Sequence, residues 1–561
     1  MKRRDFIGTS IGAVGGLMIG RNCLFADAAK EIGGNLKSTD ARRGYDLVVK
    51  GAGICGVYAA LAAAKSGLKV LVVEKRANPA FEMASKLNLT LKSEGIEDWD
   101  EETKRIFFPD GEREEISNAK LCGIAKSEMD GEALFMSGSV KKSFMRLLAA
   151  NKIDALFMSD VFGVATDENG KICGAAIAAK QGTFFAKCSS FLDADDNNFF
   201  SAKIFGAPQK IKSATFAVDC GGVKQFGKIE LPKNPEAKNC RLARGKARDG
   251  SGYFLFDFDA DTNDISAIER RAREIAASIL SDKKGTPLEK IFMSHWACEC
   301  SFDVDGNAPE SGRSDYLVFG NRKGIKSCGD ISRIKKEAGE LVGKISRDGK
   351  RGDPVRLNTV CGEVSAKGLC GNPMTESGVE LPLSVFHASK MELEEKSCDV
   401  AVAGLGTGGM FAACAAAKRG AKTLGIEYFN EVGGSKIVGG VIGYYWGLKN
   451  HPALREYEAD IKSVRGEKNS GVLSRAVRSV KLFENYDTIF GAIICGADVK
   501  ADKFESLVVC VDSKLLRIRP KTAIDCTGDA DLAAFAGVPF GKGDARGALA
   551  INYSQWDRRS P

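Results

Sequence analysis

Histidine is scarce in this sequence, with only three among 561 residues. A histidine-rich metal site needs several imidazole ligands, and a nucleophile–histidine–acid triad needs a histidine beside its nucleophile. We therefore expect neither kind of site. The one combination that suggests catalysis is Ser294-His295-Trp296, and a lone histidine beside a tryptophan is more often a packed or surface residue.

Paired cysteine motifs are also missing. The 17 cysteines include no Cys-x-x-Cys pair, and the closest couple is Cys298 and Cys300. Zinc and iron–sulfur sites need clustered thiolates, so no metal site is expected. Several cysteines, such as Cys173 and Cys510, lie in strand-like runs. We interpret most of them as small core residues.

No apolar run is long enough for a membrane-spanning helix, which needs about 20 residues. The run from Thr9 to Gly20 is short and rich in glycine, and it follows a basic start. This layout predicts an export signal over residues 1–30. Arg3 and Arg4, followed by Phe6, resemble a twin-arginine signal, so we expect a periplasmic or extracellular protein without a stable membrane span. The alternative is a basic N-terminal helix or a membrane anchor.

Neither sign of charge dominates the chain. The net charge is +8, part of the excess lies in the leader, and no basic patch is interleaved with aromatic residues. We therefore expect no nucleic-acid partner. The composition, 44% hydrophobic and 27% charged, is ordinary for a globular protein. The length suffices for about three or four domains.

The second half contains a complete dinucleotide-binding pattern. An apolar run leads into Gly404-Leu-Gly406-Thr-Gly-Gly409, a helical pattern follows, and the next apolar run ends at Glu427. Gly404 permits a tight turn, Gly406 lets the backbone approach a pyrophosphate, and Gly409 lets the helix pack against the strand. The helix N-terminus then faces the phosphates, and Glu427 is placed to bind the adenosine ribose.

The same pattern occurs near the N-terminus. Gly51-Ala-Gly53-Ile-Cys-Gly56 follows an apolar run and opens a helical pattern, and the next apolar run ends at Glu74. The spacing from the first glycine to the acid equals that in the second half. Either one nucleotide fold has been duplicated, or the chain holds two different nucleotide sites.

The similarity between the halves extends beyond the glycine turns. Each half continues into short strand-like runs separated by turn residues, which predicts a β-meander. Each meander leads into an acid and then a segment that ends in proline, Asp193 to Pro208 and Asp525 to Pro539. We interpret this order as a degenerate internal duplication of whole domains.

Three segments of the second half resemble a known family. They are the glycine turn with Glu427, the loop Val432-Gly-Gly-Ser-Lys-Ile-Val-Gly-Gly, and Ile524-Asp-Cys-Thr-Gly-Asp. Together they resemble the FAD-dependent oxidoreductases of the glutathione-reductase-like flavoprotein superfamily. The resemblance implies FAD as the cofactor, with the glycine loop near the flavin and Asp529 at the ribityl or pyrophosphate region. The implied cofactor-binding residues are Gly404, Gly406, Gly409, Glu427, Gly433, Gly434, Gly528 and Asp529.

Some of these residues have simpler alternative roles. Asp529 also fits the N-cap of a helix over Ala530–Ala536, and Gly433 and Gly434 also fit an ordinary loop.

The first half departs from the family pattern. No double-glycine loop follows Glu74, and Asp193-Ala-Asp-Asp lacks the Thr-Gly-Asp triplet. Its candidate cofactor-binding residues therefore bind FAD, bind another nucleotide loosely, or serve as scaffold; they are Gly51, Gly53, Gly56 and Glu74. A pairing of one FAD with one NAD(P), as in pyridine-nucleotide disulfide reductases, is an alternative, but their paired redox cysteines are missing here.

We expect an α/β fold, a tandem and degenerate duplication of a FAD/NAD(P)-binding Rossmann-like fold with β-meanders and inserted cap or substrate regions. After the export signal come a first nucleotide-binding domain (44–208), a cap or substrate domain with linker (209–396) and a second FAD-binding domain (397–561). The last domain stops soon after its final motif, which leaves two alternatives: the sequence is a fragment, incomplete at its C-terminus, or a partner chain completes the site.

The region between the halves contains two helical patterns, Ser266–Leu280 and Ile331–Ile345. In the first of them, we interpret Arg270, Arg271 and Arg273 as a solvated face.

The predicted function is that of an exported FAD-dependent oxidoreductase. A small-molecule substrate delivers a hydride to the flavin, and an unidentified acceptor takes the electrons. No catalytic residue can be assigned from the sequence. The alternatives are a non-catalytic nucleotide-binding or scaffold protein and a two-nucleotide reductase with FAD and NAD(P).

Overall fold

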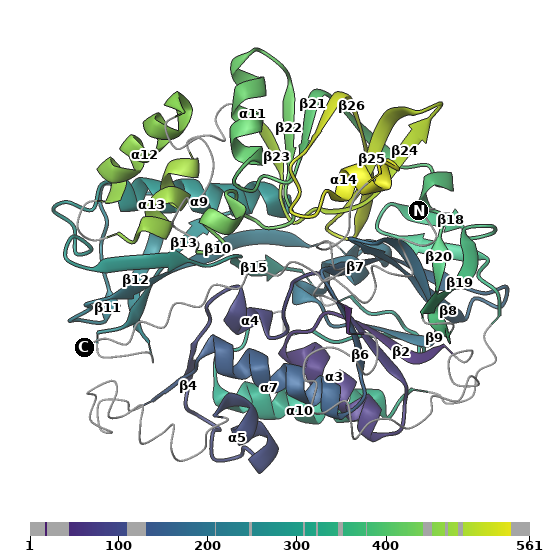
Figure 1. Cartoon of the computed structure of the whole chain (residues 1–561). Helices are drawn as coiled ribbons and strands as arrows, with labels where there is room; N and C mark the ends of the chain where they lie inside the picture. Colours follow the sequence, from purple (N-terminus) through teal and green to yellow (C-terminus); the bar gives the residue numbers. More distant parts are fainter. Residues whose placement is uncertain are drawn as a thin grey trace, which may run out of the picture.

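The computed structural model describes most of the chain from residue 44 to residue 539 (Figure 1). The described ranges are 17–18, 44–108, 131–207, 209–245, 250–306, 309–320, 324–345, 352–376, 379–440, 451–465, 469–480 and 486–539. Of the expected export signal, only the short strand β1 (Leu17–Met18) is described. The rest of residues 1–30 lies outside the described residues, as does the C-terminal part of the expected second domain.

The first unit is built on a parallel sheet whose strands are buried on both faces, as is usual for such sheets. Its strand order is β6-β3-β2-β9, and β9 continues as an antiparallel meander with β8 and β7. Helix α3 connects β2 to β3, and the short helix α8 follows β9. The elements are β2 (Tyr45–Lys50), α3 (Ile54–Lys65), β3 (Val70–Glu74), β6 (Asp154–Phe157), β7 (Ser159–Thr166), β8 (Ile172–Ala179), β9 (Gly182–Asp193) and α8 (Phe199–Ile204).

The second unit repeats this arrangement. Its strand order is β23-β22-β21-β26-β25-β24, which places parallel strands and an antiparallel meander as in the first unit. Its elements are β21 (Glu394–Ala403), α11 (Gly409–Lys418), β22 (Thr423–Ile426), β23 (Asp487–Ile489), β24 (Ile493–Lys500), β25 (Lys503–Val511), β26 (Lys514–Asp525) and α14 (Asp531–Phe535). The predicted fold class, two Rossmann-like units with β-meanders, is confirmed.

A central six-stranded antiparallel sheet lies between the two units in Figure 1. Helix α9 packs against it, and α13 of the second unit packs on both α9 and β14. The elements are β10 (Lys210–Gly221), β11 (Gly227–Lys228), β12 (Lys238–Arg244), β13 (Gly252–Asp259), α9 (Ile265–Ser281), β14 (Phe292–Trp296) and β15 (Ser301–Asp305).

The chain then returns to the first unit before the second begins. Strand β16 pairs with β9, α10 packs on α3, and β17 and β20 pair with β7 and β9. The expected domain 209–396 is therefore divided, because only 210–305 forms the central sheet. The returning elements are β16 (Tyr316–Val318), α10 (Cys328–Val342), β17 (Arg356–Thr359), β18 (Gly362–Ser365), β19 (Cys370–Glu376) and β20 (Val379–Phe386).

The remaining elements cover the ends and faces of the sheets. Helices α4, α5 and α7 lie in the first unit, and α12 and α13 lie above the central sheet in Figure 1. They are α4 (Phe81–Ala84), β4 (Thr90–Lys92), α5 (Glu101–Phe107), β5 (Glu132–Leu134), α7 (Ser137–Ala150), α12 (Pro452–Arg465), α13 (Gly471–Val480) and the short 3₁₀ turns Asp196–Asn198, Ala388–Lys390 and Gly434–Lys436.

The two units also touch each other directly. Their meanders share an apolar cluster that includes Phe185, Leu357, Ile493 and Val508. The Tyr428 hydroxyl, just after β22, donates to the backbone oxygen just after β3, that of Lys75, over 2.6 Å. The two contacts join the halves into one body.

The interpretation of three arginines of α9 as a solvated face is wrong for Arg273. Its side chain is fully buried and pairs with Glu269 at 2.8 Å, whereas Arg271 is about half exposed. Arg273 lies on the side of α9 that faces the central sheet, since its Nη2 also donates to the carbonyl of Cys298.

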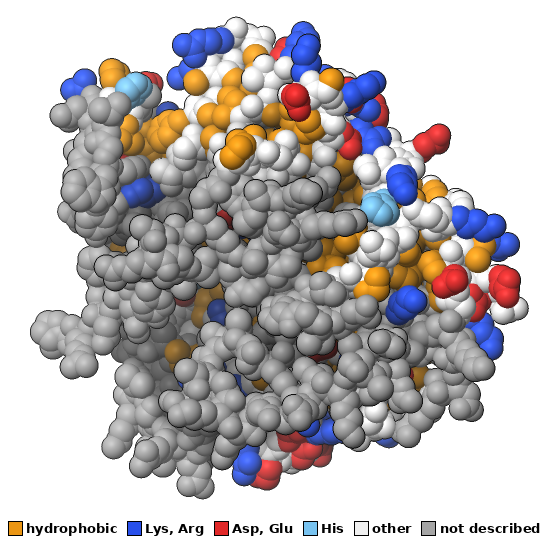
Figure 2. All heavy atoms as spheres, turned by 45° about the vertical axis from the view of Figure 1, so that its right-hand side comes forward, with side chains coloured by type: hydrophobic (Ala, Val, Ile, Leu, Met, Phe, Trp, Pro, Cys, Tyr) orange, Lys and Arg blue, Asp and Glu red, His pale blue; other side chains and the backbone are white. Residues whose placement is uncertain are grey.

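No described helix is long and apolar enough to cross a membrane. The face shown in Figure 2 has basic and acidic side chains interspersed over its described surface, with hydrophobic side chains between them.

Candidate cofactor site

Two glycine turns lie at the carboxyl ends of the parallel strands, one in each unit. The first joins β2 to α3 and the second joins β21 to α11. In each unit the next parallel strand ends at an acid, Glu74 in β3 and Glu427 just after β22. The carboxyl ends of parallel strands are where open α/β sheets bind ligands.

The two acids make the same contacts. Glu74 Oε2 accepts from the Ala52 N–H at 2.6 Å, and Glu427 Oε2 accepts from the Leu405 N–H at 2.7 Å. The second oxygen of each accepts from a backbone N–H two residues further on, that of Arg76 or Phe429. Each acid thus fixes its glycine turn against the second strand.

Burial raises the pKa of Glu427 to about 6, although the N–H groups of Phe429 and Leu405 favour its charged form.

The first and third glycines of each turn do what the spacing predicted. Gly51 and Gly404 have φ values of +99° and +81°, which side chains rarely adopt. A Cβ on Gly56 or Gly409 would overlap the carbonyl oxygen of the first glycine of its own turn. Both helices therefore pack directly against their strands.

The ends of the meanders also match. Asp193 accepts from the N–H groups of Asp195 and Ser201 at 3.1 and 3.0 Å. Asp525 accepts from the N–H groups of Thr527 and Ala533, again two and eight residues further on, at 2.9 and 2.7 Å. The repeat thus extends to individual hydrogen bonds.

Asp529 does not act as a helix N-cap. Ala530 occupies that position of α14 in the left-handed conformation and makes no side-chain cap. The Asp529 carboxylate is instead paired with Lys180, which comes from the β8–β9 turn of the first unit. Gly528, beside it, faces open space.

The second glycine distinguishes the two turns. A Cβ on Gly53 would stand 2.5 Å from Glu82 Oε1 and 2.5 Å from the ring of Phe81. A Cβ on Gly406, the equivalent residue, would have no atom of the described residues within 4 Å, and the same holds for Gly408. The first turn is covered by α4, and the second is open.

A glycine loop lies against the open turn. The Gly433 N–H donates to the Leu405 carbonyl at 2.8 Å, and a Cβ on Gly434 would stand 2.9 Å from the Cα of Gly406. Gly433 and Gly434 have φ values of +93° and +45°. The structure therefore brings together the residues that sequence analysis grouped as Gly404, Gly406, Gly409, Glu427, Gly433 and Gly434, with Gly528 near the end of β26.

A glutamate in this loop contacts the central sheet. Glu431 Oε1 accepts from the indole N–H of Trp296 in β14 at 2.6 Å. Burial raises the pKa of Glu431 to about 7, while Arg273 and this hydrogen bond act in the opposite direction. Sequence analysis missed Glu431, because nothing local links it to a tryptophan in another sheet.

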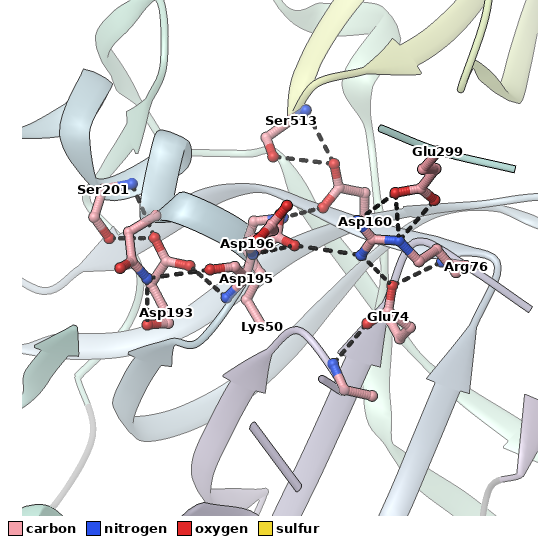
Figure 3. A network of polar contacts seen from close by, with 12 residues as sticks. Lys50, Glu74, Arg76, Asp160, Asp193, Asp195, Asp196, Ser201, Glu299 and Ser513 are labelled. Atoms are coloured by element: carbon pink, nitrogen blue, oxygen red, sulfur yellow. Dashed lines mark hydrogen bonds and ion pairs between the residues drawn. The ribbon is translucent and has the colours of Figure 1, made fainter. Parts of the chain in front are cut away.

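A network of buried charged side chains lies beside the glycine turn of the first unit (Figure 3). Lys50 pairs with Asp160 and, at 3.4 Å, with Asp195. Ser513 of the second unit donates to Asp160 from both its backbone N–H and its hydroxyl, each at 3.0 Å.

Arg76 completes this network. It pairs with Glu74 at 3.0 Å and forks onto Glu299 at 2.7 Å, so Glu74 is occupied by protein groups (Figure 3).

The Ser294-His295 pair does not form a triad. Ser294 Oγ lies 3.0 Å from His295 Nδ1 and is bonded to Asp219, and Asp219 also lies 3.5 Å from that same ring nitrogen. Serine and acid thus share one side of the imidazole, whereas a triad needs them on opposite nitrogens. Among the described residues no group of three or more metal-ligating side chains is found.

Both units match the model of one known protein family. The family model of the FAD dependent oxidoreductases matches residues 46–197 and 399–554, the two units described above. The chain belongs to this family. FAD is its cofactor, and the resemblance noted from the glycine turn, the glycine loop and the Thr-Gly-Asp segment is confirmed. The comparison with curated proteins gave no match.

Several solved flavoprotein structures are similar to part of the chain. The anhydrotetracycline hydroxylase OxyS from Streptomyces rimosus is 14% identical, with 54% of this chain and 62% of that chain covered and a TM-score of 0.36. Aklavinone-11 hydroxylase, solved with FAD and aklavinone, is 11% identical over 53% and 61%, with a TM-score of 0.38.

A third structure, glycerol-3-phosphate dehydrogenase from Bacillus halodurans with FAD, is 15% identical over 54% and 65%, with a TM-score of 0.35. The chain spans less than two thirds of the length of each of these three proteins.

Proposed function

We propose that this FAD-dependent oxidoreductase holds its FAD at the open glycine turn of the second unit. The observation that carries the proposal is the free space in front of Gly406, Gly408 and Gly528, next to a turn that has the conformation and helix packing of a dinucleotide site. A pyrophosphate can approach that backbone without displacing any described side chain.

Each part of the site has a role in this proposal. The N-terminus of α11 faces the pyrophosphate, and its partial positive charge favours the phosphates. Glu427 accepts hydrogen bonds from the ribose hydroxyls with the lone pairs that the Leu405 and Phe429 N–H groups leave available. The Gly433–Gly434 turn lies toward the flavin, and Asp529, held by Lys180, borders the ribityl or pyrophosphate region.

FAD held at this turn would supply the redox chemistry, by which a hydride from a small-molecule substrate would be taken up and the electrons passed to an acceptor. The protein binds FAD, orients it against the loop and limits the access of water.

The covered first turn argues against the alternative of a reductase that binds both FAD and NAD(P). A reductase with FAD and NAD(P) needs two accessible dinucleotide turns, and α4 covers Gly53. Of the two turns, only the second offers free space at its middle glycine.

We also propose that the protein is exported through a twin-arginine-type signal. The support is the order of Arg3, Arg4 and Phe6 ahead of a short apolar run. Replacing both arginines by lysine should retain the protein in the cytoplasm of a bacterial host, as measured by fractionation. Unchanged export of this variant would argue for another route.

The proposed function is tested by purifying the full chain, recording its visible spectrum and counting the flavin that heat or acid releases. A flavin spectrum that bleaches anaerobically with a reduced donor and returns with an artificial acceptor is expected. A colourless protein that takes up no added FAD would refute the proposal.

A further inference from the structure

The first glycine turn retains the turn, helix and acid of a dinucleotide site, but its middle glycine faces the side chains of Phe81 and Glu82. Its helix α3 is 12 residues long, Gly51 has the required positive φ, and Glu74 fixes the turn. What differs from the second unit is the segment that follows β3, which folds back as α4 over the turn.

The contacts of α4 are specific. Glu82 Oε1 accepts from the Ile54 N–H, the first residue of α3, at 3.0 Å. The Ala80 N–H donates to the Ala52 carbonyl at 2.9 Å, which ties the start of α4 to the glycine turn. Arg76 lies over the ring of Phe81, 3.9 Å from its centre, and fixes that ring in front of Gly53.

Glu82 contacts the N-terminus of α3 at the place where the phosphates of a dinucleotide would bind. A helix N-terminus offers free N–H donors, and here the acceptor is the carboxyl group of Glu82, from the chain itself. Its second oxygen, Oε2, is buried without a hydrogen-bond partner among the described residues, and burial raises the pKa of Glu82 to about 7.

The acid that would bind a ribose is also occupied. Glu74 Oε1 pairs with Arg76, which in turn is held by Glu299 of the central sheet region.

We infer that Phe81 and Glu82 take the place of the dinucleotide in the first unit, so that this unit is a self-filled nucleotide fold and each chain carries a single FAD, in the second unit. The inference rests on the proposed function for the location of that FAD. Gly51, Gly53, Gly56 and Glu74 then stabilise the fold and do not bind cofactor.

The equivalent glycines provide a matched pair of variants. Gly53 has a φ of −68°, and Gly406 is not among the glycines with positive φ, so alanine is compatible with the backbone at both positions. Only the surroundings differ. Gly406→Ala places a methyl group where the pyrophosphate of FAD would approach the protein backbone. Gly53→Ala places a methyl group against Glu82 and Phe81.

The experiment compares released FAD per chain and Tm for the full-length wild type and both variants after saturation with FAD. The wild type should contain one FAD. Without FAD, Gly406→Ala should have the same Tm as the wild type without FAD. Its Kd for FAD should be at least about tenfold higher than that of the wild type. Gly53→Ala should lower the Tm and keep one FAD.

The outcomes separate the inference from the proposed function. Two FAD per wild-type chain would place a cofactor in the first unit and overturn the inference. One FAD left in Gly406→Ala at full affinity would overturn the placement of FAD against Gly406, on which the inference rests. No FAD in the wild type would overturn the proposed function itself. Should Gly406→Ala fail to fold, titration of the wild type with ADP still decides, because two binding sites contradict the inference and one supports it.

Discussion

The indole N–H of Trp296 donates to the carboxylate of Glu431 over 2.6 Å, which joins the central sheet to the glycine loop of the second unit. Both side chains are nearly fully buried. Trp296 belongs to the sheet that follows the first unit in sequence, and Glu431 lies two residues before Gly433. The loop that borders the proposed FAD site is therefore held by a residue of the central sheet, outside the second unit.

Replacing Trp296 by phenylalanine should weaken FAD binding. The change removes the hydrogen bond and leaves a buried carboxyl group, at a cost of about 1–3 kcal/mol in the free energy of unfolding. Trp99→Phe is the matched control, because the Trp99 indole donates to the Cys328 carbonyl at 2.9 Å in the first unit. Its loss should destabilise the fold and leave the Kd for FAD unchanged. Equal FAD affinities in the two variants would contradict the proposed role of Trp296.

Glu431→Gln should change how stability depends on pH. Burial raises the pKa of Glu431 from 4.5 to about 7. The folded state therefore holds this proton more tightly than the unfolded chain, and the resulting stability is complete below pH 4.5 and lost as pH rises through about 7. Urea unfolding between pH 4 and pH 9 should show the stability difference between wild type and variant changing across about 4.5–7 and constant above it. Parallel curves would show that Glu431 does not titrate in this window.

Truncating Arg273 should be strongly destabilising. Its partner Glu269 is as buried as Arg273, at 1% exposure, so Arg273→Ala leaves an uncompensated charge at a cost of about 3–5 kcal/mol. Arg271→Ala on the same helix is the control, and its effect should stay below about 1 kcal/mol because the side chain is half exposed. Denaturant unfolding measures both. A similar small effect for the two variants would mean that Arg273 is solvated in solution.

The ion pair between Arg76 and Glu299 should contribute to acid stability. Burial raises the pKa of Glu299, but the Arg76 guanidinium outweighs it and lowers the pKa from 4.5 to about 2. The pair then stabilises the fold above pH 4.5, and the contribution is lost as pH falls through about 2. Glu299→Gln lacks this titration, so the advantage of the wild type in acid unfolding should shrink over this range. An advantage that stays constant down to pH 2 would contradict the pairing.

The features that sequence analysis predicted best are those fixed by local chain geometry. The spacing from Gly404 to Glu427 requires a strand, a turn, a helix and a second strand in that order, and the structure has them. The common order of elements in the two halves was visible for the same reason, because the glycine turns and the acids Asp193 and Asp525 act on residues close to them in sequence.

The features that it missed depend on contacts between distant segments. Nothing in Phe81-Glu82 indicates that these residues cover Gly53, since the same sequence fits an ordinary surface turn. The three arginines of α9 were assigned together to a solvated face, but their exposure falls from 49% for Arg271 to 26% for Arg270 and 0% for Arg273, which faces the central sheet. The pairing of β17 with β7 and of β20 with β9 joins strands nearly two hundred residues apart, which divides the expected domain 209–396.

Those late pairings have a consequence for how the protein is made. The partners that β17 and β20 supply to β7 and β9 are synthesised after the whole central sheet, and β20 ends at Phe386, just before β21 begins. Non-local pairing of this kind is slow, and domains fold during synthesis as their last elements emerge. Strands β7 and β9 therefore have no partner from β17 and β20 until the chain has been made as far as Phe386, so the sheet of the first unit is completed only after the whole central sheet has been synthesised.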